Sequence, residues 1–258
     1  MLTQRPASTA CNHGLECGIR NAFLLLAILL LAACTSTQVR TAEGPQGTPL
    51  RIDGSVVMVT PDIELSEVGA GGVAEPRQAW TETARREYPQ AARQLLARQG
   101  VELRPDFAIP LEAGPEHRLR QIELLNQAVS MSILQYSGRG GRLRNKDGKF
   151  DWSLGPGVAD LRKATGADYA LFTYLRDSYS SGGRVAMRVI GFVLLGGDIG
   201  GGMQIGVASL VDLRTGQVVW HNLLVDQTGD LRTPTGASET AGDLLKRFPV
   251  QPAAAASR

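Results

Sequence analysis

The chain has 258 residues, of which 43% are hydrophobic and 20% are charged, and its formal net charge is +2. This hydrophobic fraction is sufficient for a globular core, and the length suits one domain of ordinary size with extended ends. The small net charge gives no support for nucleic-acid binding, and three cysteines in a chain of this length exclude a dense disulfide framework.

An apolar run, Asn21–Cys34, begins directly after Arg20 and ends at a cysteine. Its last four residues, Leu31-Ala32-Ala33-Cys34, resemble the lipobox of bacterial lipoproteins, in which the peptidase requires small side chains and the thiol carries the diacylglycerol. Its apolar core, Ala22–Leu31, is about half as long as a membrane-spanning helix. We therefore predict a lipoprotein signal peptide over residues 1–33 and lipidation of Cys34. The alternative is a transmembrane or buried helix that ends in cysteine by chance.

The segment after Cys34 is polar and rich in Thr, Gly and Pro, which predicts a flexible tether over residues 34–53. The β-branched run Ser55–Thr60 predicts a buried strand that ends at Pro61. We expect Asp62–Gly72, with its acids and glycines, to form a solvated loop that carries an exposed sheet edge. Its carboxylates Glu64 and Glu67 lack the spacing of a calcium loop.

Two long segments have helical patterns. In Glu75–Gln99, Pro76 would occupy the first turn, and Pro89 predicts a kink or two helices that meet there. In Pro115–Tyr136 the apolar residues recur every three or four positions, which predicts one buried stripe. The expected stripe consists of Leu119, Ile122, Leu125, Val129, Ile133 and Tyr136.

A basic, Gly-rich loop is predicted at Gly138–Lys149. The pattern favours a mobile surface loop, and contact with anionic lipid headgroups or a cell-wall polymer is the alternative. A short helix is expected at Val158–Thr165, ended by Gly166, and a strong strand at Asp168–Tyr179.

Towards the end of the chain, Gln204–Asp226 predicts an antiparallel hairpin that turns at Asp212–Gly216. An amphipathic helix is expected at Thr235–Phe248, followed by a disordered tail over residues 249–258. The preceding connection, Ser180–Met203, contains many glycines and an apolar middle. It either folds over the domain's own sheet or contacts a partner chain or membrane.

The order of these elements predicts one α+β domain over residues 54–248, with a mixed, mostly antiparallel sheet and packed helices. Candidate catalytic groups are sparse. His117 and His221 are the only histidines after Cys34, and they lack the paired spacing of a metal site. We therefore expect no metal, no cofactor and no catalytic residues, with Cys34 as the only residue that carries definite chemistry.

Several segments resemble a known group. Gly166–Gly183 (GADYALFTYLRDSYSSGG) and Ala208–Asn222 (ASLVDLRTGQVVWHN), followed by a helix, resemble the periplasmic lipoproteins that include the curli-secretion channel lipoprotein and the lipoprotein activator of a penicillin-binding protein. In that group a strand beginning Gly-Ala-Asp leads to a variable insertion and then to a strand and a (D/N)xxTG turn. The opening Val56–Glu82 is similar to uncharacterised proteobacterial lipoproteins.

The resemblance implies an outer-membrane lipoprotein with an anticodon-binding-like or TolB-N-terminal-like domain, without enzymatic activity. In the curli channel the insertion equivalent to Ser180–Met203 forms a membrane hairpin. Here the segment lacks the sustained alternation of about ten residues per strand that a barrel needs. A secretion pore is therefore the less favoured variant.

Three functions remain as hypotheses. The first is a lipid-anchored scaffold or assembly factor, facing the periplasm from the outer membrane, that contacts a protein partner or itself through Asp62–Gly72 and Ser180–Met203. Thr35 after the cysteine fits export to that membrane. The second is an oligomeric secretion pore component. The third is a hydrolase that uses Asp168 or Glu64, which rests only on isolated acids.

Overall fold

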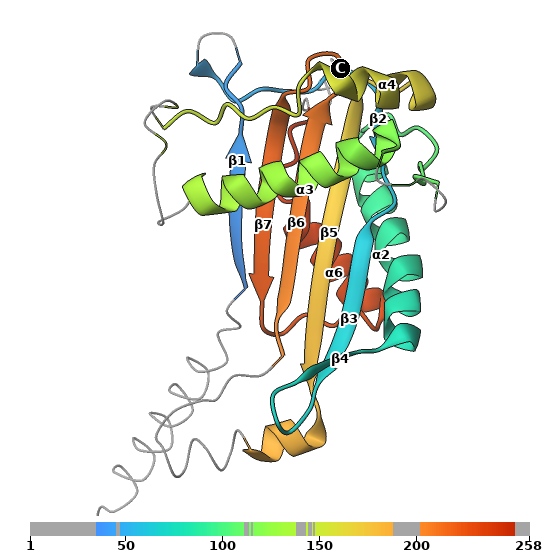
Figure 1. Ribbon diagram of the computed structural model, residues 1–258, viewed down its shortest axis with the longest axis vertical. Coiled ribbons are helices and arrows are strands. Elements are labelled where there is room, and N and C mark those ends of the chain that lie inside the picture. The colour runs from blue at the N-terminus through green and yellow to red at the C-terminus, as the bar shows by residue number, and fades with distance from the viewer. Residues whose placement is uncertain are drawn as a thin grey trace, which may run out of the picture. The chain divides into compact units, whose positions relative to one another are not determined.

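The computed structural model describes residues 35–44, 47–110, 114, 116–137, 143, 146, 148–187 and 202–250 (Figure 1). The predicted signal peptide, Cys34 and the tail after residue 250 lie outside these residues. So do most of the basic loop and residues 188–201 of the apolar connection. Lipidation of Cys34 therefore stays a prediction.

A seven-stranded sheet forms the centre of the domain, in the order β1-β7-β6-β5-β3-β4, with β2 paired to β5 outside this path. β5 pairs in parallel with β2 and β3, and the other pairs are antiparallel. The sheet is therefore mixed and mostly antiparallel, and the predicted α+β class is confirmed. The strands are β1 (Ser36–Thr41), β2 (Val56–Met58), β3 (Asp62–Val68), β4 (Ala74–Pro76), β5 (Tyr169–Ser180), β6 (Gln204–Asp212) and β7 (Val218–Asp226).

Helices cover both faces of this sheet (Figure 1). On one face, α2 (Gln78–Arg98) and α6 (Pro234–Leu244) pack on a cluster that contains the buried Trp220 and Leu175. On the other face, α3 (Arg118–Ser137), a 3-10 turn η3 (Pro156–Val158) and α4 (Ala159–Thr165) close a second cluster. Because side chains alternate along a strand, neighbouring residues of β5 enter different clusters.

The predicted tether is wrong for the part that the structure describes. Ser36–Thr41 forms the edge strand β1, paired along its whole length with β7. Its side chains alternate between exposed and half-buried, as expected for an edge strand with one solvated face. Ala42 and Ile52, within the same predicted tether, are buried. Long-range pairing with β7 thus overrides a composition that is typical of a linker.

The predicted loop at Asp62–Gly72 is also wrong. Asp62–Val68 is strand β3, which pairs with β5 on one side and, near its end, with β4 on the other. Ile63 and Leu65 are fully buried in the cluster under α2 and α6. The residues that alternate with them are polar, and their side chains point to the other face of the sheet. Only the turn beyond Val68 remains a connection.

Both long helices form, with differences from the expected boundaries. α2 starts at Gln78, because Pro76 belongs to β4, and it continues through Pro89 as one helix. The alternative of two helices is therefore wrong. In α3 the predicted stripe holds at Ile122 and Ile133, but Leu125 and Tyr136 are exposed. The inner face instead includes buried polar residues, Asn126 and Ser130.

The C-terminal half follows the sequence pattern. The strand at β5, the hairpin of β6 and β7 and the short helix ended by Gly166 are confirmed. The helix α6 is also confirmed with its apolar side buried, but it ends at Leu244 and not at the expected Phe248. Residues 182–187 of the connection are helical.

The hairpin turn gives a direct test of the fold. Gly216 has φ +80°, and a Cβ placed there would lie 2.2 Å from the carbonyl oxygen of Gly155. Gly216→Ala should therefore lower the free energy of unfolding by about 2 kcal/mol, measured by urea denaturation. Gly157→Ala, where a Cβ meets nothing within 4 Å, is the matched control. Equal stability of the two variants would contradict this account of the turn.

Candidate functional site

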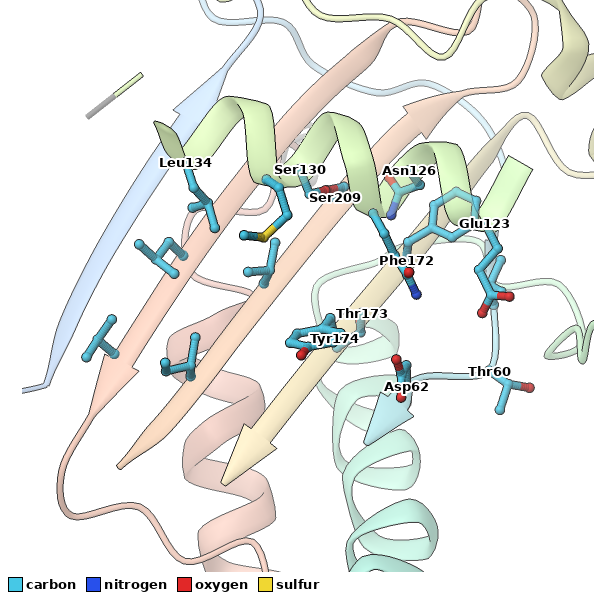
Figure 2. Close-up of a pocket in the computed structure, with 17 residues that line it drawn as sticks. Thr60, Asp62, Glu123, Asn126, Ser130, Leu134, Phe172, Thr173, Tyr174 and Ser209 are labelled. Atoms are coloured by element: carbon cyan, nitrogen blue, oxygen red, sulfur yellow. The ribbon is translucent and has the colours of Figure 1, made fainter. Parts of the chain in front are cut away.

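A groove of about 590 Å³ lies between α3 and the sheet (Figure 2). α3 crosses the strands, so it covers only part of this sheet face (Figure 1). The side chains that line the groove come from α3 and from the strands beneath and beside it. Its volume falls within the roughly 300–1,000 Å³ that ligand pockets occupy. The groove is lined by Val59, Thr60, Asp62, Glu123, Asn126, Gln127, Ser130, Met131, Leu134, Phe172, Thr173, Tyr174, Ile205, Val207, Ser209, Leu223 and Val225.

One end of the groove is aliphatic. Ile205 and Val207 come from β6, and Leu223 and Val225 from the neighbouring strand β7. Residues two apart in a strand share a face, so these four side chains form one continuous patch. Leu134 of α3 lines the same groove (Figure 2).

The other end is polar. Asp62, at the start of β3, accepts a hydrogen bond from the Arg176 guanidinium at 3.0 Å, and that guanidinium lies 4.0 Å from the ring centroid of Tyr174. Glu123 of α3 is paired with Arg120. Both carboxylates are thus neutralised by arginine next to the groove. A polar ligand would meet carboxylate and amide oxygens at this end.

Asn126 is the least satisfied polar residue of the groove. Its side chain is only 7% exposed, and its Oδ1 has no hydrogen-bond partner among the described residues. A buried amide oxygen without a partner costs about 1–3 kcal/mol relative to a satisfied one.

The neighbouring polar pair holds the helix in place. The hydroxyl oxygens of Ser130 on α3 and Ser209 on β6 are 2.9 Å apart, and both residues are buried. This contact fixes the helix above the strands. It is a direct polar link between the helix and strand β6.

α3 exposes several apolar side chains, of which Met131 also lines the groove. Met131 is 64% exposed and Leu124 40%, and the two are seven residues apart, which places them on one side of the helix. Leu125 and Tyr136 are exposed on an adjacent side. We call these four residues the α3 ridge. Their concentration on one helix is the pattern of a contact surface.

A second polar cluster is found on the opposite face of the sheet. Asp177 accepts hydrogen bonds from Tyr179 Oη and from Gln204 Nε2, the latter at 3.0 Å. The Gln204 Oε1 in turn accepts a hydrogen bond from Thr240 of α6 at 3.1 Å. Burial raises the pKa of the Asp177 carboxyl, and the two donors offset this only in part. The cluster ties β5, β6 and α6 together.

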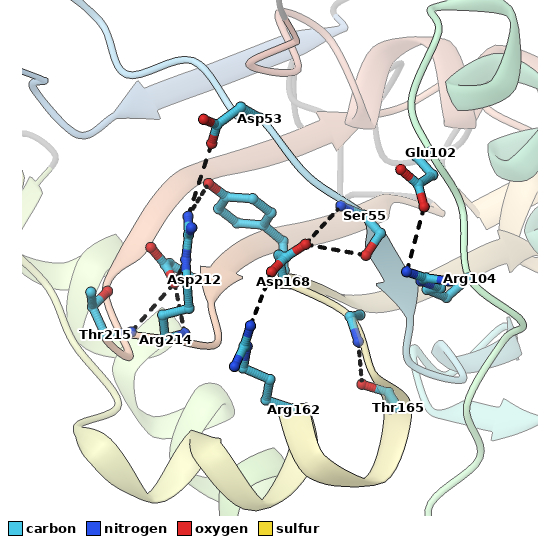
Figure 3. A network of polar contacts seen from close by, with 12 residues as sticks. Asp53, Ser55, Glu102, Arg104, Arg162, Thr165, Asp168, Asp212, Arg214 and Thr215 are labelled. Atoms are coloured by element: carbon cyan, nitrogen blue, oxygen red, sulfur yellow. Dashed lines mark hydrogen bonds and ion pairs between the residues drawn. The ribbon is translucent and has the colours of Figure 1, made fainter.

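The third polar network joins the chain before β2 to the start of β5 (Figure 3). Asp168 accepts hydrogen bonds from the Ser55 backbone N–H at 3.2 Å and from Arg162 at 3.3 Å. Burial alone would raise the pKa of Asp168, but these bonds outweigh it and lower the pKa. Arg214 is paired with Asp53 and Asp212 in the same network. These contacts hold the segment before β2, the start of β5 and the β6–β7 turn together, which is a structural role.

The structure does not bring the isolated acids together. Glu64 is exposed on β3 opposite Arg176, whereas Asp168 precedes β5 at the other end of the sheet. Glu67 is paired with Arg77 and lies on the opposite face of β3 from Glu64. Among the described residues, no group of three His, Cys, Asp or Glu side chains is arranged to hold a metal ion.

The two histidines also lie in different environments. His117 is exposed just before α3. His221 of β7 is buried, and burial lowers its pKa to about 4. Its Nε2 has no hydrogen-bond partner in the part of the chain that the structure describes.

Comparison with protein-family models gives no match, and neither does comparison with curated protein sequences. Among solved structures, the chain is similar to the PelC dodecamer from Paraburkholderia phytofirmans, with a TM-score of 0.39 and 14% identity over 84% of this chain and 99% of that chain. A variant PelC dodecamer from the same organism gives a TM-score of 0.37 and 14% identity over 84% of this chain and 100% of that chain. Similarity at this level transfers no function to the present chain.

None of the helices in the described part of the chain combines the length and the hydropathy needed to cross a bilayer. Sequence analysis missed the groove residues because Asn126 and Ser130 are polar positions on the inner face of a helix. A signal was nevertheless present in the strands. β6 and β7 carry apolar residues on both faces, so both faces need cover.

Proposed function

We propose that this chain is a lipid-anchored accessory or assembly protein of the bacterial outer membrane. Cys34 would carry the anchor, and the domain would face the periplasm. It would work through protein contacts and without enzymatic activity, as the resemblance to the curli-channel and penicillin-binding-protein-activator lipoproteins implies. The observation that carries the contact surface is the α3 ridge.

The ridge supports this proposal on energetic grounds. Each large apolar side chain that a partner covers contributes roughly 25 cal/mol per Å² of buried surface. The buried pair of Ser130 and Ser209 holds the helix on the sheet, so little ordering is required when a partner binds. The α3 ridge thus replaces Asp62–Gly72 as the proposed contact surface, because Asp62–Val68 is already paired within the sheet.

A crosslinking experiment in cells tests the contact surface. Photoreactive residues are placed at Leu124 and Met131 on the ridge, and at Arg86, exposed on α2, as the matched control. We expect ridge positions to yield a discrete crosslinked protein, identified by mass spectrometry, that is absent at Arg86. A crosslink only to a second copy of the chain would assign the ridge to self-association. The same products at all three positions would contradict the proposal.

Mass spectrometry of the mature N-terminus tests the anchor in the same preparation. The proposal requires a peptide that begins at acylated Cys34 and continues through Thr35. An N-terminus elsewhere, or an unmodified Cys34, would remove the anchor from the proposal while leaving the ridge to be judged by its crosslinks.

A further inference from the structure

The end of the sheet at which β3 and β5 finish exposes large apolar side chains. They are Val73, Val185, Met187 and Met203, which we call the apolar tip. Their exposed fractions run from 40% at Met203 to 67% at Val73. Figure 1 shows the turn between β3 and β4 beside the helical residues 182–187, and a Cβ placed on Gly183 would lie 3.3 Å from that of Ala70. The exposed side chains therefore belong to segments that lie together.

Backbone hydrogen bonds fix these segments to the sheet. The Ser181 N–H, just before the short helix, donates to the carbonyl oxygen of Val68 at the end of β3, at 3.0 Å. The carbonyl oxygen of Met203 accepts a hydrogen bond from the Ser178 N–H of β5 at 3.1 Å. The apolar tip is thus held on the ends of β3 and β5, so little ordering is required when it enters a contact.

The apolar tip carries little charge. Among residues 69–73, 182–187 and 202–203, Arg184 is the one charged residue. Exposed valine and methionine side chains gain free energy when they leave water for the boundary between lipid headgroups and acyl chains. An arginine is tolerated there, because its charge is attracted to lipid phosphate. This composition fits the surface of a phospholipid bilayer.

The strand register places the apolar tip on the membrane side of the domain. Ser36, the first residue of β1, is level with Arg176 of β5 through the pairings of β7 and β6. Beyond this row, β5 continues to Ser180 and β3 to Val68, which is about 13 Å further in the direction from which the chain enters β1. An anchor at Cys34 would lie two residues before Ser36. A bilayer that holds this anchor therefore lies where the apolar tip projects.

We propose that the apolar tip inserts into the headgroup region of the phospholipid bilayer that holds the anchor. The inference rests on the lipid anchor of the proposed function and adds a second membrane contact to it. β1 and the β3–β4 pair are at opposite edges of the sheet, so the two contacts together restrict rotation of the domain about the anchor. The apolar tip shares no residue with the groove or with the α3 ridge.

The test measures how close single positions lie to lipid. The full-length protein is expressed, processed and reconstituted in vesicles of phosphatidylethanolamine and phosphatidylglycerol. Cys11 and Cys17 precede Cys34 and would be removed with the signal peptide, so an acylated Cys34 leaves no reactive thiol. Val73→Cys and Val185→Cys then each introduce one site for a thiol-reactive bimane dye. Phospholipids with a nitroxide on the upper acyl chain quench a dye that enters the bilayer.

The control is Ala164→Cys, at an exposed position of α4 near the start of β5. The twelve residues of β5 span roughly 40 Å, so this position lies far from a bilayer at the other end of the sheet. We expect lipid quenching at least about threefold stronger at Val73 and Val185 than at Ala164. Quenching at the tip positions no stronger than at Ala164, in protein with acylated Cys34, would overturn the inference.

Two further outcomes would also count against it. A dye at Val73 that is shielded both from the nitroxide lipids and from aqueous iodide would assign the apolar tip to a protein contact and overturn the membrane contact. Dye uptake by the wild-type protein would show that Cys34 is not acylated. That result would overturn the anchor, and the inference with it, by a signal that does not depend on the tip positions.

A charge substitution tests the apolar character of the tip. Val185→Glu places a carboxylate in the surface that enters the bilayer, and it should weaken the lipid quenching of a dye at Val73→Cys at least about threefold. Ala164→Glu adds the same charge at the other end of the sheet and should leave that quenching unchanged. Both positions are exposed, and thermal melting confirms that each variant is folded. Unchanged quenching in Val185→Glu would overturn the proposed insertion.

Discussion

Replacing Gln204 with leucine is expected to lower the free energy of unfolding by about 3 kcal/mol. Gln204 donates a hydrogen bond to the buried carboxylate of Asp177 and accepts one from Thr240. All three residues are nearly inaccessible to solvent, so water cannot replace the lost contacts. Leucine is of similar size, and the cost therefore reports the hydrogen bonds and not a cavity. Urea denaturation at pH 7 measures the effect.

Gln78→Leu is the control for this variant, because Gln78 is exposed at the start of α2 and its hydrogen bond to Glu82 lies at the surface. Its free energy of unfolding should change by less than about 0.5 kcal/mol. The pKa of Asp177 is raised in the folded protein, so protonation of this carboxyl favours folding. The penalty of Gln204→Leu should therefore shrink as the pH falls towards that raised pKa. A penalty that is independent of pH would show that Asp177 does not depend on Gln204.

Acidification is expected to destabilise the protein through His221. Burial lowers the folded pKa of this residue to about 4, below its ordinary value of 6.5. In the unfolded chain the His221 imidazole becomes protonated as the pH falls below 6.5. In the folded chain it stays neutral until about pH 4. Stability is therefore lost as the pH falls through this window. At 1.36 kcal/mol per unit, the loss amounts to about 3 kcal/mol.

The measurement compares the slope of unfolding free energy against pH between 7 and 4 in the wild-type and His221→Leu proteins. The variant should lack the His221 contribution, whatever its absolute stability, because leucine does not titrate. His117→Gln is the matched control, since His117 is exposed before α3. Parallel slopes in the wild-type and His221→Leu proteins would mean that His221 is not held neutral by the fold.

The fold was largely predictable where local pattern and tertiary contacts agree. β5, the β6 and β7 hairpin and α6 each carry a hydrophobic period that matches their burial. β1 was not predictable, because its polar residues become a strand only through pairing with β7. β3 had a readable signal in its alternation of Ile63 and Leu65 with polar residues. The acids and glycines that follow it obscured that signal.

The candidate site was less predictable than the fold. Its lining comes from β3, α3, β5, β6 and β7, which are separated by long stretches of chain, so no local motif encodes it. The apolar period of α3 predicts a buried Tyr136, which is exposed, and gives no reason to expect the buried Asn126. A helix that crosses the strands obliquely buries residues of its flank, and the crossing angle cannot be read from periodicity.

The pairing of β1 with β7 also limits the reach of the protein. An acylated Cys34 would leave only Thr35 between the lipid and the first residue of β1. The Thr35 hydroxyl is itself bonded to Asp226 at 3.1 Å, so even this residue is held by the sheet. A nine-residue strand such as β7 spans about 30 Å. Without a flexible linker, the distance between the domain and the bilayer cannot increase. Any partner of this domain would therefore have to approach within roughly one strand length of the bilayer.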